Sequence, residues 1–428
     1  MEWAVGIAAV LALIALGIPI AFAMTVIGMA GVAWIIGTAP MLAMLGQVFF
    51  DNGMSYTLSV MPLFVLMGNF VVQAGLADEL YAASNAWLRH LRGGLAMATV
   101  VACGGFASVC GSSLATAATM ARVAMEPMRR YGYSDQLAAG SIAAGGTLGI
   151  LIPPSIVLVL YGILTGQDIG KLFLAGILPG IVGIIGYMIA VRLSIWWTGE
   201  QSQLLPPLPL IDRLRALRGV VGVLLLFAIV MGGIYLGVFT ATEAAGIGAG
   251  GAFLLTLARR RLDWQTLRTI LVDTAKMTSL MFFVLFGALM FSNFVNLAGM
   301  PEDLKSVILS VGARPEFVLL VIFVIYLLLG MVLESLSMML LTVPIFYPVV
   351  ASLGVDLIWF GIFVVVAIEI SLITPPVGLN VFVLKTVIRD IDTNTIFKGV
   401  MPFVLIDIVR ILLLMALPII ALLIPNSM

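Results

Sequence analysis

Small polar side chains gather at two points where otherwise apolar sequence is interrupted. The groups are Ser112, Ser113 and Thr116 at the first interruption, and Glu334, Ser335 and Ser337 at the second. Hydroxyl and carbonyl oxygens are hard donors, which suit Na⁺ or another hard cation. The N-terminus of a helix exposes unpaired N–H groups and the positive end of its dipole, which suit a carboxylate. The chemistry that these residues favour is therefore the binding of a cation and an organic acid.

Each interruption is followed by a pair of adjacent prolines in a long apolar run. Pro153-Pro154 breaks Leu148–Gly162, and Pro375-Pro376 breaks Leu372–Leu384. Proline has no N–H and disfavours helix at the residue before it, so neither run forms one continuous helix. In hydrocarbon the freed carbonyls are tolerated only beside protein or a hydrophilic cavity. Broken helices at corresponding positions of two halves are typical of a transporter's binding site. The residues that border the two breaks here are Gly149, Ser155, Thr374, Gly378 and Asn380.

The same residues have simpler interpretations. Membrane serines and threonines often bond the carbonyl of residue i−4 or join helices. Glu334 either completes a cation site or sits protonated as a hydrogen-bond donor, and both remain open. Asn69 and Asn293 precede the two interruptions and could reach the site. Three further acids with apolar flanks have no assigned intramembrane basic partner, and we predict that they are structural or interfacial: Glu243, Glu369 and Asp407.

The composition indicates a polytopic membrane protein. The 428 residues are 62% hydrophobic and 10% charged, and the mean hydropathy is +1.20. A soluble domain is closer to one-quarter charged. The formal net charge is zero, which disfavours nucleic-acid binding. Met1-Glu2-Trp3 has no basic region, so we expect the first apolar segment to be retained.

An enzymatic function is not predicted. His90 is the only histidine, and it lies in a basic stretch with no sign of proximity to Ser112. No histidine cluster supports metal-dependent hydrolysis, and no Gly-x-x-x-x-Gly-Lys loop supports ATP use. Cys103 and Cys110 lie in apolar sequence and are expected to pack rather than react. We predict no cofactor.

The chain contains an internal repeat. Pro375 follows Pro153 by 222 residues, and the same offset relates Glu334 to Ser112. After one inserted residue, Gly399 to Pro402 repeats Gly176 to Pro179. We therefore divide the chain into N-terminal scaffold helices (1–60), repeat 1 (61–197, interruption near 110–116 and break near 149–155), a polar linker with a scaffold helix pair (198–276), and repeat 2 (277–428, interruption near 334–338 and break near 374–380).

The local pattern predicts the shape of each repeat and its orientation. Each polar interruption is flanked by apolar arms that fall short of the roughly 20 residues needed to span, so we expect re-entrant hairpins with their tips at the interruptions. An amphipathic segment at 263–276 precedes a span at 277–297, and residues 198–219 form a polar linker. Five crossings separate the hairpins and basic residues flank the base of the first, so the repeats should be inverted, with the basic side cytoplasmic.

The motifs around these residues resemble the large membrane subunit (DctM-type permease) of tripartite ATP-independent periplasmic (TRAP) transporters. The matching stretches are Gly111-Ser112-Ser113-Leu114-Ala115-Thr116-Ala117, Met128-Arg129-Arg130-Tyr131-Gly132-Tyr133, Ile152-Pro153-Pro154-Ser155, Lys171-Leu172-Phe173-Leu174-Ala175-Gly176-Ile177-Leu178-Pro179-Gly180, Thr240-Ala241-Thr242-Glu243-Ala244-Ala245 and Thr374-Pro375-Pro376-Val377-Gly378-Leu379-Asn380. Cys110 and Ala241 depart from the family pattern, but neither removes a hydroxyl at an interruption.

The resemblance implies an all-α polytopic membrane protein of the ion transporter superfamily, with inverted repeats and an elevator-type mechanism. It also implies Na⁺-coupled uptake (symport) of an organic acid across the bacterial inner membrane. A small four-helix membrane subunit and a periplasmic substrate-binding protein would be its partners. By this resemblance the Na⁺ ligands would be Ser112, Ser113, Gly149, Glu334, Ser335, Thr374, Pro375 and Gly378. Substrate would contact Ser112, Ser113, Thr116, Pro154, Ser155, Ser337 and Asn380.

Two alternatives stay open at this point. The chain could be a stand-alone ion-coupled anion symporter of related architecture, which would transport without a binding protein. It could also be a non-transporting membrane scaffold or a channel, which would show no saturable, Na⁺-stimulated uptake.

Overall fold

The computed structural model describes residues 2–200, 204–311 and 314–428, and within these ranges the chain is helical, with no strand. Seven of the described helices are long and apolar enough to cross a membrane. They are Tyr56–Gln73, Ile169–Thr198, Leu210–Tyr235, Ala241–Ala258, Trp264–Leu297, Ser335–Ser352 and Thr393–Ala416. The prediction of an all-α, multi-pass membrane protein is confirmed.

The N-terminal part consists of short helices. Gly17 to Pro19 separates the first two, so the apolar run at the N-terminus forms two helices rather than one kinked helix. The elements are α1 (Glu2–Ala15), α2 (Ile20–Ile36), α3 (Thr38–Gly53), the 3₁₀ helix η1 (Tyr56–Ser59), α4 (Val60–Gln73) and α5 (Leu76–Leu88).

A pair of helices, a broken helix and a long helix follow. The pair is α6 (Gly94–Cys110) and α7 (Ser113–Arg130), which meet at the first polar interruption. The broken helix is α8 (Asp135–Thr147), η2 (Leu148–Ile150) and α9 (Ile156–Thr165), and the long helix is α10 (Ile169–Thr198).

The same order of elements returns in the C-terminal part, after three connecting helices. The connecting helices are α11 (Leu210–Tyr235), α12 (Ala241–Ala258) and α13 (Trp264–Leu297). They are followed by α14 (Met300–Val311), the pair α15 (Pro315–Leu329) and α16 (Ser335–Ser352), the broken helix α17 (Leu357–Ser371) and α18 (Leu379–Val387), the long helix α19 (Thr393–Ala416), and the short α20 (Ile419–Leu422) and η3 (Pro425–Ser427).

Two segments differ from their predicted form. The amphipathic segment 263–276 and the span 277–297 form one 34-residue helix, α13, which crosses the predicted boundary at 276/277. Helix α11 begins at Leu210, inside the predicted linker 198–219. In both places polar residues lie at the end of an apolar helix and continue its hydrogen-bond ladder, because a change in polarity does not itself end a helix.

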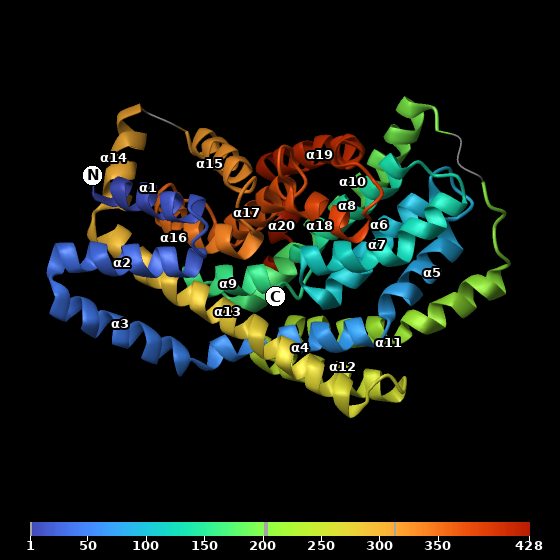
Figure 1. The fold of residues 1–428 in the computed structure, drawn as a ribbon, viewed down its shortest axis with the longest axis horizontal. Helices are drawn as coiled ribbons and strands as arrows, with labels where there is room; N and C mark the ends of the chain where they lie inside the picture. Colours follow the sequence, from blue (N-terminus) through green and yellow to red (C-terminus); the bar gives the residue numbers. More distant parts are fainter. Residues whose placement is uncertain (1, 201–203, 312–313) are drawn as a thin grey trace.

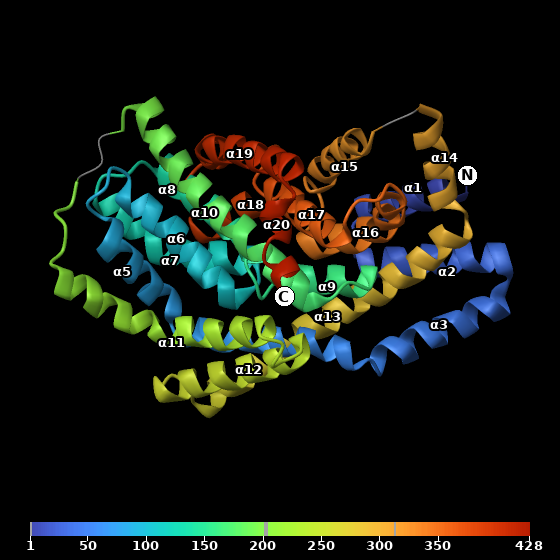
Figure 2. The same cartoon turned by 180° about the vertical axis from the view of Figure 1, so that it is seen from behind.

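The helices form two layers (Figures 1 and 2). The outer layer comprises α2, α3, α4, α11, α12 and α13: α13 packs on α2, α3 and α4, while α12 packs on α4 and α11. The inner layer comprises α6 to α10 and α15 to α19, and it contains both Pro-Pro breaks. Within it the two parts of the chain interlock, since α18 packs on α7 and α8 while α16 packs on α9.

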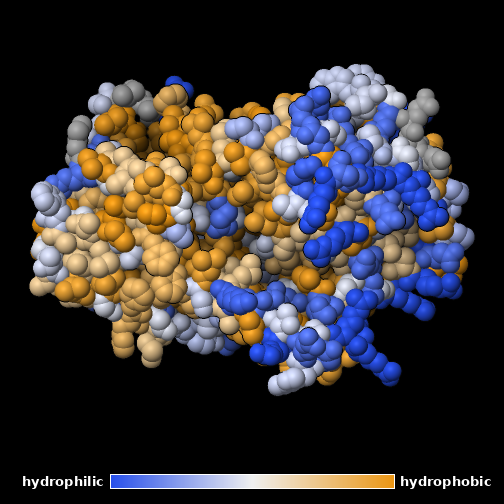
Figure 3. All heavy atoms as spheres, in the orientation of Figure 1, coloured by the Kyte–Doolittle hydropathy of each residue, from blue (hydrophilic) through white to orange (hydrophobic). Residues whose placement is uncertain are grey.

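Hydrophilic residues gather at one end of the molecule (Figure 3, right), where α5 and α12 end and α11 begins. Exposed basic residues at these helix ends include Arg92, Arg215 and Arg260. Apolar side chains cover most of the remaining surface in that view. Such a distribution is typical of a membrane protein with one basic face.

Small residues let the inner helices approach closely. Helices α8 and α19 cross at Gly140 and Gly399, where a Cβ added to Gly140 would collide with the Gly399 carbonyl group. Close approach at small residues increases van der Waals contact between membrane helices, which replaces the missing hydrophobic driving force. This crossing joins α8, which precedes the first break, to the long helix α19, which follows the second broken helix.

We expect Gly140→Ala to destabilise the folded protein by about 1–3 kcal/mol, because the new methyl group meets backbone that cannot rotate away. Gly250→Ala is the matched control, since Gly250 lies in helix α12 with nothing within 4 Å of its added Cβ. Alanine's higher helix propensity should leave that variant neutral or slightly stabilised. Thermal unfolding of the purified chain measures both, and equal stability of the two variants would contradict the close crossing.

Candidate functional site

The first break is closed by a serine. Ser155 caps α9: its Oγ accepts a hydrogen bond from Leu158 N at 3.3 Å and donates one to the carbonyl oxygen of Ile150. The Pro153-Pro154 peptide bond between these two contacts is cis. Ser155 is fully buried, so its hydroxyl satisfies backbone groups that the prolines leave without intrahelical partners.

The first polar interruption lies against this break. Gly111 has φ +65°, and Ser112 caps α7 with its Oγ 3.4 Å from Ala115 N. The Thr116 hydroxyl donates to the Ser112 carbonyl at 2.7 Å. A Cβ at Gly149 would lie only 2.7 Å from that same carbonyl oxygen, and one at Gly111 would lie 3.0 Å from Pro154 O. The structure therefore brings Ser112, Thr116 and Gly149 together beside Pro154.

The second break contains a positive-φ glycine. Gly378 has φ +56° and precedes α18, and the Pro375-Pro376 peptide bond is cis. The Thr374 hydroxyl donates to Ile370 O at 2.6 Å, and Asn380 N donates to Leu372 O at 3.1 Å. The hydroxyl and the amide N–H thus satisfy carbonyl groups at the end of α17.

Asn380 also links the two breaks. Its side-chain Nδ2 donates to Ala143 O of α8 at 3.1 Å, and its Oδ1 is buried without a partner in the described part of the chain. An amide oxygen with no hydrogen bond in a buried position is costly, so it is a group that a ligand could satisfy. Asn380 therefore joins α18, which follows the second break, to α8, which precedes the first.

Glu334 has a defined structural role at the second interruption. It caps α16: its Oε1 accepts hydrogen bonds from both the backbone N–H and the hydroxyl of Ser337, each at 3.0 Å. Ser335, the first residue of the helix, is buried. The cap uses one carboxyl oxygen as a hydrogen-bond acceptor at a helix N-terminus, and both interpretations left open for Glu334, a cation ligand or a protonated hydrogen-bond donor, stay predictions.

The assignments as Na⁺ and substrate ligands stay predictions. Within residues 2–200, 204–311 and 314–428, no hydrogen bond joins the Glu334 interruption to Ser112 or Thr374. Ser113 and Thr116 are buried in α7. Asn69 does not contact either interruption through its amide donor, which binds Thr274 Oγ1 of α13 at 2.9 Å.

An ion-pair group joins the two parts of the chain at the hydrophilic end. Arg129 of α7 lies 2.6 Å from Asp135 Oδ1 and 2.8 Å from Asp390 Oδ2. The Arg129 guanidinium lowers the pKa of the Asp390 carboxyl group by hydrogen bonding to it. Because these side chains are partly exposed, the ion pairs are screened and contribute little to stability.

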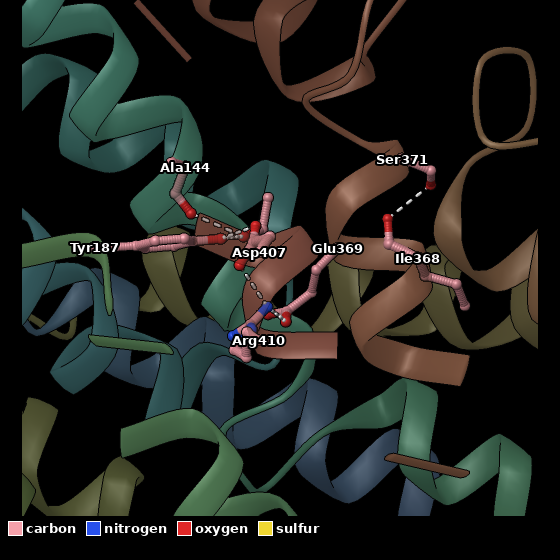
Figure 4. A network of polar contacts seen from close by, with 8 residues as sticks. Ala144, Tyr187, Ile368, Glu369, Ser371, Asp407 and Arg410 are labelled. Carbon is pink, nitrogen blue, oxygen red and sulfur yellow. Dashed lines mark hydrogen bonds and ion pairs between the residues drawn. The ribbon is translucent and has the colours of Figure 1, made fainter. Parts of the chain in front are cut away.

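Sequence reasoning named Glu369 and Asp407 but missed their partners. They belong to a second polar group, the Arg410 cluster, which we define as Thr147, Tyr187, Glu369, Asp407 and Arg410. Figure 4 labels all of these except Thr147. Arg410 Nη2 donates to Glu369 Oε2 at 2.6 Å, and the Tyr187 hydroxyl lies 2.6 Å from Asp407 Oδ2. Glu369 and Asp407 therefore do have a basic partner inside the apolar sequence. The signal that could have found it is the spacing of Asp407 and Arg410, three residues apart on one apolar helix.

Comparisons with known proteins identify relatives over nearly the whole chain. Residues 7–420 match the model of the family "Tripartite ATP-independent periplasmic transporter, DctM component". The chain is 36% identical over 378 residues to the C4-dicarboxylate TRAP transporter large permease protein DctM of Pseudomonas aeruginosa, covering 88% of each chain. It is 31% identical over 420 residues to the sialic acid TRAP transporter large permease protein SiaM of Vibrio cholerae, covering 97% of this chain and 96% of the relative.

A solved structure shares the fold. The crystal structure of the Alcanivorax borkumensis YdaH transporter superposes with a TM-score of 0.66 at 14% sequence identity, covering 91% of this chain and 88% of that one. The relatives that the comparisons name are transporter permease subunits, not enzymes.

We expect Glu334→Ala to destabilise the protein by about 1 kcal/mol, because α16 loses its cap. Glu334→Gln should cost less, because an amide oxygen can still accept from Ser337 N. Thermal unfolding of the two variants beside the unmodified chain tests the cap. Equal losses in both variants would mean that the negative charge, rather than the accepting oxygen, stabilises this turn.

Proposed function

This chain belongs to the DctM component family of TRAP transporters, and from that premise we propose that it carries an organic acid together with Na⁺ across a bacterial inner membrane. It would work with a periplasmic substrate-binding protein that delivers the acid and with a small four-helix membrane subunit.

The contact between the first polar interruption and the first Pro-Pro break carries this proposal. At Ser112 and Gly149 a capping hydroxyl, a backbone carbonyl and the Thr116 hydroxyl lie together in apolar surroundings. Oxygens of this kind are neutral hard donors, which suit a monovalent cation that must be released again after transport. The N-terminus of α7 starts at the same place, and its N–H groups suit a carboxylate.

The names of the relatives support an acid as substrate. One is a C4-dicarboxylate permease and another a sialic acid permease, and both compounds carry a carboxylate. A site made of hydroxyls, backbone groups and Asn380 would recognise the carboxylate that such acids share. Selection among acids would then rest largely with the binding protein.

The layered fold supports an elevator-type movement. The inner layer holds both breaks and interlocks through α18 on α7 and α16 on α9, so it could move as one body against the outer layer. The repeated order of helix pair, broken helix and long helix supports inverted repeats around one site.

The test is uptake by proteoliposomes that contain this chain and its small subunit, with and without the binding protein. We expect saturable uptake of a carboxylate only when an inward Na⁺ gradient and the loaded binding protein are both present. Equal uptake without the binding protein would instead identify a stand-alone symporter. Absence of saturable uptake in the complete system would contradict transport.

We expect Thr374→Ala to raise the Na⁺ concentration for half-maximal uptake about tenfold, since one lost oxygen ligand is worth roughly 1.4 kcal/mol. Thr269→Ala is the matched control: Thr269 also donates to its i−4 carbonyl, but it lies exposed on α13. The control should keep the normal Na⁺ dependence. An unchanged Na⁺ dependence in Thr374→Ala would remove Thr374 from the cation site.

A further inference from the structure

The Arg410 cluster has more acids than bases. Its ionisable groups are Tyr187 from α10, Glu369 from α17, and Asp407 and Arg410 from α19, while α8 contributes only Thr147 and the Ala144 carbonyl. Glu369 and Asp407 are fully buried and Arg410 is 2% exposed. With both acids ionised, the cluster would hold one net negative charge inside the apolar protein, which is very costly. The balance of charge therefore requires one more hydrogen.

Three contacts between oxygen atoms, linked in a chain, give a way to assign this hydrogen. Thr147 Oγ1 lies 2.8 Å from Ala144 O and 3.1 Å from Tyr187 Oη, and Tyr187 Oη lies 2.6 Å from Asp407 Oδ2. These three hydrogen bonds need three hydrogens, and the two hydroxyl groups supply only two.

The direction of the chain is fixed at one end. The Ala144 carbonyl can only accept, so Thr147 gives its single hydrogen there. The 3.1 Å contact between Thr147 and Tyr187 is then a hydrogen bond only if Tyr187 donates it, and this uses the hydrogen that Tyr187 would otherwise donate to Asp407 Oδ2. If Asp407 were ionised, the shortest of the three contacts would have no hydrogen. A hydrogen on Asp407 Oδ2 completes the chain.

The position of Arg410 agrees with this assignment. Its Nη2 donates to Glu369 Oε2 at 2.6 Å. The same nitrogen lies 3.0 Å from Asp407 Oδ1, but Oδ1 receives no hydrogen bond within the described part of the chain. Glu369 is thus the ionised partner of the guanidinium.

We propose that Asp407 is a proton-binding site: its carboxyl group holds a hydrogen on Oδ2 and donates it to Tyr187, while Glu369 and Arg410 form the ion pair. In this state the cluster has no net charge. Its hydrogen bonds run from α19 through α10 to α8, and its ion pair joins α19 to α17. Helices α8 and α17 are those that lead into the two breaks, so the bound proton stabilises the arrangement of both. The inference does not depend on which substrate or ion is carried.

The internal repeat relates two contacts of the Arg410 cluster to each other. Glu369 follows Thr147 by 222 residues and Arg410 follows Tyr187 by 223, which are the two offsets of the internal repeat. The contact of Thr147 with Tyr187 therefore corresponds to the contact of Glu369 with Arg410. One pair is neutral and the other is ionic, and Asp407 connects them.

The experiment compares Asp407→Asn with Glu369→Gln in the full chain, purified in lipid nanodiscs. The amide of the first variant donates to Tyr187 as the protonated acid does, so we expect its Tm to stay within about 2 °C. In Glu369→Gln, Arg410 has no counter-charge as long as Asp407 keeps its hydrogen. The counter-charge is restored only if Asp407 loses that hydrogen. We expect its Tm to fall by more than about 5 °C. Tolerance of both variants would indicate two ionised acids, and the reverse order would place the proton on Glu369. Either result would overturn the proposal.

Infrared difference spectra at neutral pH give an independent measurement. The unmodified chain should show the C=O stretching band of a buried, protonated carboxyl group, and Asp407→Asn should lose it. Glu243→Gln is the control and should keep the band, since Glu243 is exposed and caps α12 through Thr240. If the unmodified chain shows no such band, or if Asp407→Asn retains it, Asp407 does not hold the proton.

Discussion

The structure depends on one constraint: in an apolar interior, every backbone group freed by a helix break needs a partner. The two Pro-Pro breaks free such groups, and short polar side chains satisfy them. Ser155 bonds Ile150 O at the first break, and Thr374 bonds Ile370 O at the second. Asn380 also donates to Ala143 O inside α8, and so joins α18 to the helix that precedes the first break. The residues that stabilise the breaks are thus the ones that line them.

Glycines let backbone carbonyl groups of the first interruption and the first break lie close to neighbouring helices. Gly149 leaves room for the Ser112 carbonyl, and Gly68 of α4 leaves room for Cys110 O, from which an added Cβ would be only 3.1 Å away. Gly176 of α10 faces Leu151 O in the same way, at 2.6 Å. Each of these approaches places backbone carbonyl oxygens against a neighbouring helix rather than a side chain. The local geometry therefore depends on the absence of a Cβ at these positions. A larger residue at any of them would displace one of these backbone carbonyl oxygens.

Much of this arrangement follows from local sequence, because its causes are local. Pro153-Pro154 and Pro375-Pro376 break helices wherever they occur, and Ser112 and Glu334 begin helices through contacts three residues away. The Arg410 cluster could not be predicted in this way, since Glu369 and Arg410 are 41 residues apart and meet only when α17 packs on α19. The continuous helix α13 was missed for another reason: its polar and apolar halves have the same helical period, and only hydrophobicity changes at residue 276.

The two kinds of polar group have different electrostatic requirements. The proposed site for a transported ion would need neutral oxygens whose combined attraction is moderate, and the groups around Ser112 and Gly149 are neutral. A fixed charge in the same apolar layer would bias such a site over many ångströms, because little water is present to screen it. The Arg410 cluster avoids this by balancing its charges internally. Glu334 is the one acid at an interruption, and its carboxyl group lies at the N-terminus of α16, where it accepts two hydrogen bonds from Ser337.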